Sequence, residues 1–190
     1  ELSCQAIKGS CEAGAILAES VNRSIARLQK VGVHILALPC NTLHLFADTF
    51  AVAPTVRLLH IVDAVIQELQ SENITRVGLL ATNLTVSSGL YADRCRLSGI
   101  QCITPSESSQ QELSEHIGYF VKTGATAVGA AGTFENIFHE FRRAGVTAVV
   151  FGCTDVSGML TRCGFTAPIR CIDSMDVLAK ACAQLCVGQL

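Results

Sequence analysis

The sequence lacks several features that would place it in a specialised class of protein. It has no tryptophan, and aromatic and charged residues make up only 5% and 16% of its 190 residues. So few charges exclude a coiled coil, and a hydrophobic content of 49% excludes a disordered chain. Its 14 basic residues nearly balance its 16 acidic ones, which excludes a strongly charged surface for a nucleic acid or an anionic membrane. The longest apolar run, 31–40, contains His34 and is too short for a membrane span, so we expect a globular chain with a small-molecule partner.

The sequence also lacks the motifs of common metal and cofactor sites. It contains no Cys-x-x-Cys or His-x-x-x-His pair and no glycine-rich nucleotide loop, so we expect no metal and no cofactor. Ten cysteines lie at scattered spacings. Disulfide frameworks are typical of short secreted chains with small cores, whereas this chain is long enough to bury a large one. We therefore interpret most of the cysteines as reduced and the protein as cytoplasmic.

Short runs rich in valine, isoleucine and leucine alternate with longer amphipathic stretches, which is typical of an α/β fold with parallel strands wrapped in helices. The apolar spacing predicts helices at 12–30, 62–71, 86–98, 109–123, 134–144 and 174–187. Short apolar runs predict strands at 33–38, 56–60, 76–81, 100–103, 146–151 and 169–172. These strands are continuously hydrophobic rather than alternating, so we expect helices on both faces of each sheet.

An internal repeat with a spacing of 113 residues predicts two similar lobes. The matched pairs are Gly32 and Gly145, Val33 and Val146, Cys40 and Cys153, Arg57 and Arg170, and Asp63 and Asp176. We expect two pseudo-symmetric α/β lobes, each a parallel sheet flanked by helices, with residues 1–72 and 173–190 in the first and 73–172 in the second. The strand at 76–81 opens the second lobe, and its counterpart would precede residue 1. The first lobe is therefore expected to lack its opening strand.

Cys40 and Cys153 each follow a predicted buried strand and precede polar residues. Open α/β sheets bind ligands at the carboxyl ends of their strands, so the repeat predicts the two thiols on opposite sides of one cleft. Backbone N–H groups at a helix start favour anions, and we expect them to lower the thiol pKa toward neutrality and prepare a thiolate base. A lone buried cysteine is as often a packing residue, but recurrence beside polar neighbours favours a chemical role.

A third polar cluster follows the strand predicted at 76–81. Thr82 and Thr85 stand at the start of the next predicted helix, where hydroxyl and backbone N–H groups can hold a carboxylate. An ordinary helix cap explains the same local pattern equally well.

Five motifs together resemble the cofactor-independent aspartate/glutamate racemase superfamily. They are Pro39-Cys40-Asn41-Thr42-Leu43-His44, Leu59-His60-Ile61-Val62-Asp63, the segment 78–91 with Thr82, Thr85 and Tyr91, Gly152-Cys153-Thr154-Asp155, and Ile172-Asp173-Ser174. Pro39, His44 and Asp155 resemble the aspartate branch more than the glutamate branch. The resemblance implies two α/β domains with the active site between them, one catalytic cysteine from each, no cofactor, and a homodimer.

The resemblance also implies a role for each matched residue. Cys40 and Cys153 would exchange the α-proton of an amino acid, with aspartate as the expected substrate. Lys122 would bind the distal carboxylate, although a solvated lysine at a helix end fits its position equally well. The early arginine of the family has no counterpart, and Lys8 is the nearest cation. The residues implied in holding the α-carboxylate and the amine are Asn41, Thr42, Thr82, Thr85 and Thr154.

Two other functions stay open on the sequence alone. Another enzyme of the superfamily would use one or both cysteines on a small diacid, as a decarboxylase or a cis–trans isomerase, although retention of both cysteines argues against the decarboxylase. A catalytically inactive member would keep the fold as a binding protein, which the missing opening strand favours. Entry of solvent deuterium into unreacted amino acid separates racemisation from decarboxylation.

Overall fold

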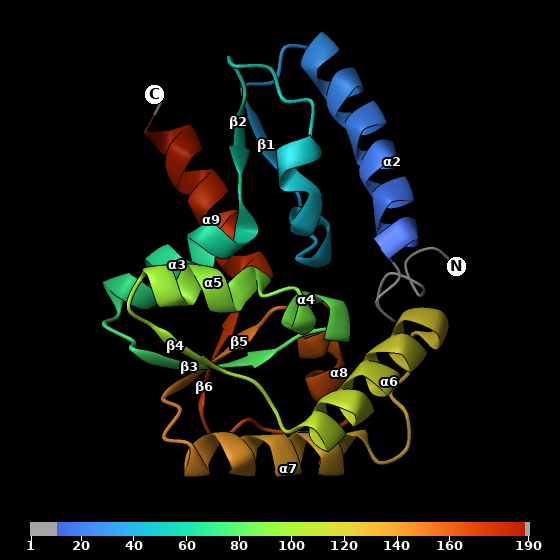
Figure 1. Cartoon of the computed structure of the whole chain (residues 1–190), viewed down its shortest axis with the longest axis vertical. Coiled ribbons are helices and arrows are strands. Elements are labelled where there is room, and N and C mark those ends of the chain that lie inside the picture. The colour runs from blue at the N-terminus through green and yellow to red at the C-terminus, as the bar shows by residue number, and fades with distance from the viewer. Residues whose placement is uncertain (1–10, 189–190) are drawn as a thin grey trace.

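The chain folds into two parallel β-sheets flanked by helices, in a computed structural model that describes residues 11–188, with side chains from residue 16. Figure 1 shows the smaller sheet and its helices stacked on the larger one. The predicted α/β class with two parallel sheets is confirmed. Lys8 lies outside the described residues. No helix within residues 11–188 is both long and apolar enough to cross a membrane.

The smaller sheet has two parallel strands, β1 (Ile35–Ala37) and β2 (Arg57–Leu59). α2 (Cys11–Lys30) lies beside this sheet, and a 3-10 helix, η1 (Thr42–Thr49), follows β1 and packs against α2. η1 was not among the predicted helices. The buried core of this lobe is small and consists of Ala18, Ile25, Leu36 and Phe50.

The larger sheet has four parallel strands in the order β4–β3–β5–β6. Its centre is β3 (Arg76–Leu80) and β5 (Ala148–Phe151), and its edges are β4 (Gln101–Ile103) and β6 (Arg170–Asp173). Side chains alternate between two core clusters along each central strand, as the pleat of a strand requires. In β5, for example, Val150 belongs to one cluster and Phe151 to the other. All four residues of β5 are buried, so the prediction of two covered faces is confirmed for this sheet.

Helices cover both faces of the larger sheet (Figure 1). One face packs against α3 (Ile61–Ser71), α5 (Leu90–Leu97) and α9 (Ser174–Val187). The other packs against α6 (Glu107–Thr123), α7 (Ala130–Arg143) and α8 (Val156–Arg162). α9 also contacts α3, β1 and β2, so it serves both sheets. The predicted division at residues 72 and 173 places one boundary immediately after α3 and the other immediately before α9, and it stays a prediction.

The helix predicted at 86–98 is wrong, because two helices occupy that segment. α4 (Asn83–Ser87) is followed by α5, and Gly89 between them has a φ of 73°. A positive φ is available to glycine at little cost but ends a right-handed helix. The apolar spacing runs on across this break, so periodicity alone did not reveal it. α8 was also absent from the predicted elements.

The repeat is visible in the registers of the two sheets. Ile35 pairs with Arg57 in the smaller sheet, and Ala148 pairs with Arg170 in the larger one, 113 residues later. On its other side β5 pairs with β3, whereas within residues 11–188 β1 pairs with β2 alone. Ala37 is correspondingly exposed, so the prediction of two covered faces is wrong for the smaller sheet.

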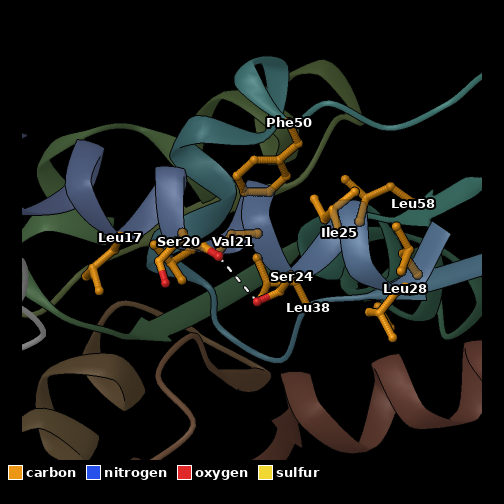
Figure 2. A pocket seen from close by; sticks show the side chains of 12 residues that line it. Leu17, Ser20, Val21, Ser24, Ile25, Leu28, Leu38, Phe50 and Leu58 are labelled. Atoms are coloured by element: carbon orange, nitrogen blue, oxygen red, sulfur yellow. Dashed lines mark hydrogen bonds between the residues drawn. The ribbon is translucent and has the colours of Figure 1, made fainter. Parts of the chain in front are cut away.

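An apolar groove of about 240 Å³ lies between α2 and β1 (Figure 2). Val21, Ile25 and Leu28 of α2 line it. Their counterparts 113 residues later are Phe134, Phe138 and Phe141, which are buried between α7 and the larger sheet. The groove is therefore the open counterpart of a core that β3 and α6 complete in the second lobe.

Candidate active site

Cys40 and Cys153 occupy equivalent places in the two lobes. Cys40 lies just before η1 in the loop after β1, and Cys153 lies just before α8 in the loop after β5. Cys40 is half-buried and Cys153 is buried, and both are free thiols. A negative charge on Cys40 raises the pKa of Cys153, so the two sulfurs share one electrostatic environment. The structure thus places the two predicted thiols at corresponding strand ends.

The expected lowering of the thiol pKa values is wrong for the chain as it stands. Burial raises the pKa of Cys40, and it raises that of Cys153 to about 12. Backbone N–H groups act in the predicted direction, since those of Thr42 and Leu43 lower the pKa of Cys40. Desolvation outweighs them, because removing water disfavours the thiolate more than the N–H groups favour it. Sequence reasoning captured the helix start and missed the depth of burial.

Asp155 adds a third acidic group beside the thiols. The thiol of Cys153 donates to Oδ2 of Asp155 at 3.9 Å, and the charge of Asp155 raises the pKa of both Cys40 and Cys153. Burial also raises the pKa of Asp155 itself. Each of these groups resists ionisation, and a nearby cation would lower the pKa of each. In the sequence, Asp155 was recognised only as part of the resemblance to the family.

Three of the predicted polar residues form one hydroxyl cluster. Oγ1 of Thr42 lies 3.3 Å from that of Thr82 and 2.9 Å from that of Thr85, and the hydroxyl of Thr82 donates to that of Thr85 at 3.0 Å. Thr42 comes from the first lobe, whereas Thr82 and Thr85 begin α4 in the second. Thr82 also caps α4 by accepting from the N–H of Thr85. The cap interpretation is therefore confirmed, and the role of the cluster in holding a carboxylate stays a prediction.

Asn41 joins three parts of the fold. Its Nδ2 donates to the hydroxyl of Ser174 at 2.9 Å, and its Oδ1 accepts from the hydroxyl of Tyr91 at 2.6 Å. Asn41 is 2% exposed and Tyr91 1%, so neither group can exchange this partner for water. Tyr91 and Ser174 belong to the recognised motifs, but no pattern in the sequence connects them with Asn41.

The remaining predicted residues lie more openly. Thr154 is half-buried between Cys153 and Asp155. Lys122 is exposed near the end of α6 and lines a cavity of about 550 Å³. Asn83, directly after Thr82, lines the same cavity. The structure thus brings Thr42, Thr82 and Thr85 together, and it places Lys122 at a cavity beside α4.

Two histidines near Cys40 form a further buried group. The rings of His44 and His60 meet edge to face with centroids 4.4 Å apart. Burial lowers the pKa of both, to about 4 for His60, so both are neutral at pH 7. Within residues 11–188 no group of three or more His, Cys, Asp or Glu side chains is arranged to hold a metal ion.

The comparisons with known proteins place this arrangement in a family. The model of the Asp/Glu/Hydantoin racemase family matches residues 3–182. The chain belongs to this family, and the expectation of a racemase fold and enzyme class is confirmed.

Individual relatives agree with this assignment. The chain is 28% identical over 155 residues to the broad specificity amino-acid racemase RacX of Bacillus subtilis, covering 82% of this chain and 66% of that protein. It is similar in structure to the aspartate racemase of Picrophilus torridus, with a TM-score of 0.71, 26% identity, and coverage of 86% of this chain and 67% of the other. An aspartate racemase homologue of Pyrococcus horikoshii gives a TM-score of 0.73 at 21% identity, covers 88% and 73% of the two chains, and shows the fold alone.

Proposed function

We propose that the protein racemises aspartate without a cofactor, using Cys40 and Cys153 as the two bases that act on opposite faces of the α-carbon. Family membership supports amino-acid racemisation, and the equivalent strand-end positions of the two thiols support a two-base reaction. One base on each face is the simplest way to remove a proton from one side and return one to the other.

The cluster of acidic groups is the observation that carries this proposal. Burial raises the pKa values of Cys40, Cys153 and Asp155, and the charge of Asp155 raises those of the two thiols further. An amino acid brings an α-ammonium group, and a cation near these groups would stabilise one thiolate. The substrate itself would then create the base that attacks it. A site that stays protonated until a cation arrives also protects its thiolate from solvent oxidants.

The hydroxyl cluster supplies the complementary contacts for the α-carboxylate. Thr42, Thr82 and Thr85 present three hydroxyl groups within 3.3 Å of one another. When a thiolate removes the α-proton, negative charge moves from the α-carbon onto the carboxylate, and hydrogen bonds that strengthen there lower the barrier. The other thiol then donates its proton from the opposite face, so proton and charge balance after each turnover.

Lys122 is the proposed contact for the distal carboxylate of aspartate. It lines the same cavity as Asn83. Asn83 directly follows Thr82, a member of the hydroxyl cluster, in the sequence. The exposure of Lys122 and the likeness to the broad-specificity racemase of Bacillus subtilis favour a second candidate, a racemase that accepts several amino acids. Comparison of aspartate with alanine as substrates decides between the two.

The test is racemisation in deuterium oxide without added pyridoxal phosphate. Wild-type protein should interconvert L- and D-aspartate and place deuterium on the α-carbon of the product. Cys40→Ala and Cys153→Ala should each lower racemisation at least about 100-fold, because each removes one of the two proton carriers. Each variant should keep slow α-exchange of one enantiomer only, and the two variants should keep opposite ones. Cys186→Ala, at an exposed thiol of α9, is the matched control and should keep full activity.

Three outcomes would contradict the proposal in different ways. Either cysteine variant within tenfold of wild type removes the two-base assignment. Release of carbon dioxide or isomerisation of an unsaturated diacid favours another superfamily reaction. Tight binding of aspartate without α-exchange favours a binding protein.

A further inference from the structure

His44 is a buried side chain that the proposed reaction does not use directly. It lies in the first turn of η1, four residues after Cys40, and is 3% exposed. Its Nδ1 lies 2.9 Å from the carbonyl oxygen of Cys40, and its Nε2 accepts from the backbone N–H of Ile61 at 3.3 Å. The imidazole therefore connects the backbone of Cys40 to the first residue of α3.

These two contacts specify one form of the ring. The N–H of Ile61 can only donate, so Nε2 must be unprotonated, and the carbonyl of Cys40 can only accept, so Nδ1 must carry the proton. A single neutral tautomer satisfies both partners. Burial has the largest effect on the pKa of His44 and lowers it, which favours the neutral ring, whereas the backbone groups of Cys40 and Leu59 act in the opposite direction. His60 faces it from the start of α3, Arg94 faces it from α5, and Asp63 is the one acidic side chain acting on it from α3.

The anchored carbonyl belongs to the turn that surrounds the Cys40 sulfur. The N–H groups of Thr42 and Leu43 approach the thiol and stabilise its charged form. Thr42 and Leu43 lie in the sequence between Cys40 and His44, and the hydrogen bond from the His44 side chain to the Cys40 carbonyl closes this segment into a turn. The backbone N–H of His44 also donates to the carbonyl of Asn41 at 3.0 Å. Loss of the side-chain anchor would let the turn open and the N–H groups of Thr42 and Leu43 move away from the sulfur.

We propose that His44 is a positioning residue for Cys40: by donating from Nδ1 to the Cys40 carbonyl, it holds the Thr42 and Leu43 N–H groups toward the sulfur and so stabilises the thiolate when it forms. The catalytic part of this inference rests on the proposed function, whereas its effect on the thiol does not. The hydrogen bond to Cys40 positions the turn, and the hydrogen bond from Ile61 fixes the ring so that Nδ1 is the donor.

Three substitutions of His44 separate the effects of its hydrogen bonds with Cys40 and Ile61. His44→Asn places an amide N–H where Nδ1 lies and keeps the donor to Cys40. His44→Gln places its amide nearer the position of Nε2 and keeps only the contact with Ile61. His44→Ala loses both. His139→Ala, at an exposed histidine of α7, is the control. Thermal unfolding of each variant shows whether it remains folded.

The primary readout is the rate of Cys40 alkylation by iodoacetamide across pH, followed by mass spectrometry of the Cys40 peptide. His44→Ala and His44→Gln should shift the Cys40 profile to higher pH by about one unit, which is a tenfold loss of thiolate. His44→Asn should restore most of the shift. The profile of Cys186, an exposed thiol of α9, serves as an internal reference and should not move. Equal profiles for wild type and His44→Ala, or equal rescue by Asn and Gln, would overturn the proposal.

Kinetics give the second readout. His44→Ala should lower kcat for racemisation about tenfold and change KM by less than about threefold, because the substrate contacts remain while the base is lost. A large rise in KM with unchanged kcat would contradict a positioning role. If no variant racemises any amino acid but the Cys40 profiles behave as described, the proposed function fails and the positioning role stands.

Discussion

His60 and Asp173, which lie 113 residues apart, begin α3 and α9 in the same way. The side chain of each accepts a hydrogen bond from the N–H two residues later, that of Val62 in α3 and that of Met175 in α9. Both copies of the repeat thus have an N-terminal cap on this helix, but the capping group is an imidazole in one and a carboxylate in the other. Asp173 also accepts from the hydroxyl of Ser157, whereas Nη2 of Arg94 lies 3.0 Å from Nε2 of His60. A carboxylate caps one helix and a titratable ring caps the other.

The histidine cap makes stability depend on pH in a defined direction. Burial, with His44 and Arg94 nearby, lowers the pKa of folded His60 to about 4, whereas an unfolded histidine titrates near 6.5. Between these values the unfolded chain binds a proton that the folded chain does not, so the free energy of unfolding decreases as pH falls from about 6.5 to about 4. His44 acts in the same direction. Urea unfolding at pH 7 and pH 5 measures the loss.

His60→Asn provides the control for this prediction. Asparagine caps helices well and keeps an acceptor for the N–H of Val62, but it does not titrate. The variant should lose less stability than wild type between pH 7 and pH 5. Equal losses would show that other groups account for the pH dependence.

Tyr91→Phe should destabilise the chain because it removes a buried hydrogen bond and leaves one partner in place. The hydroxyl of Tyr91 donates to Asn41 at 2.6 Å, and both residues are nearly inaccessible. Leaving Oδ1 of Asn41 without this donor is expected to lower the free energy of unfolding by about 1–3 kcal/mol. Tyr119→Phe, at an exposed tyrosine, should change it by less than about 0.5 kcal/mol. Denaturant unfolding of both variants tests the difference, and equal effects would show that the Asn41 contact contributes nothing.

Lys122→Met should affect diacids selectively. If Lys122 binds the distal carboxylate, its loss should raise KM for aspartate about tenfold or more and change KM for alanine less than twofold. Lys180→Met, which removes an exposed partner of Glu68, is the control and should alter neither value. Parallel changes for both amino acids would place Lys122 outside the substrate site and favour the broad-specificity candidate.

Leu28 and Phe141 occupy matched positions in α2 and α7, and the two lobes should respond differently to a charge there. Phe141 is fully buried, so Phe141→Asp is expected to cost about 3 kcal/mol or more. Leu28 is 44% exposed in the groove, so Leu28→Asp in the 190-residue chain should cost less than about 1 kcal/mol. Similar losses in the two variants would show that the groove is already filled.

The sequence predicts the parts of the fold that depend on the pattern of hydrophobic residues along the chain. Continuous apolar runs located the six strands within a few residues, and the 113-residue spacing predicted two related lobes whose registers match. Local sequence did not reveal the break at Gly89, because glycine ends a helix only where the backbone takes a positive φ.

The candidate site was predictable in composition but less so in its electrostatics. The cluster of Thr42, Thr82 and Thr85 joins residues about 40 positions apart, and family resemblance anticipated it. Tyr91, Ser174 and Asp155 were missed as site residues because their importance arises from contacts made only after folding. The direction of the thiol pKa values was missed for the same reason, since burial is decided by the whole fold rather than by a helix start.

Among the residues that the structure describes, β1 is hydrogen-bonded on one side only, and this affects how each lobe opens. Backbone groups in a central strand such as β5 exchange their amide hydrogens only in large unfolding events, whereas a strand bonded on one side can exchange by local opening. The two lobes therefore share a sequence repeat but differ in how well their backbone amides are protected from hydrogen exchange. Cys40 follows the less protected strand and Cys153 the more protected one, so in the chain as described here slow chemical modification should reach Cys40 first.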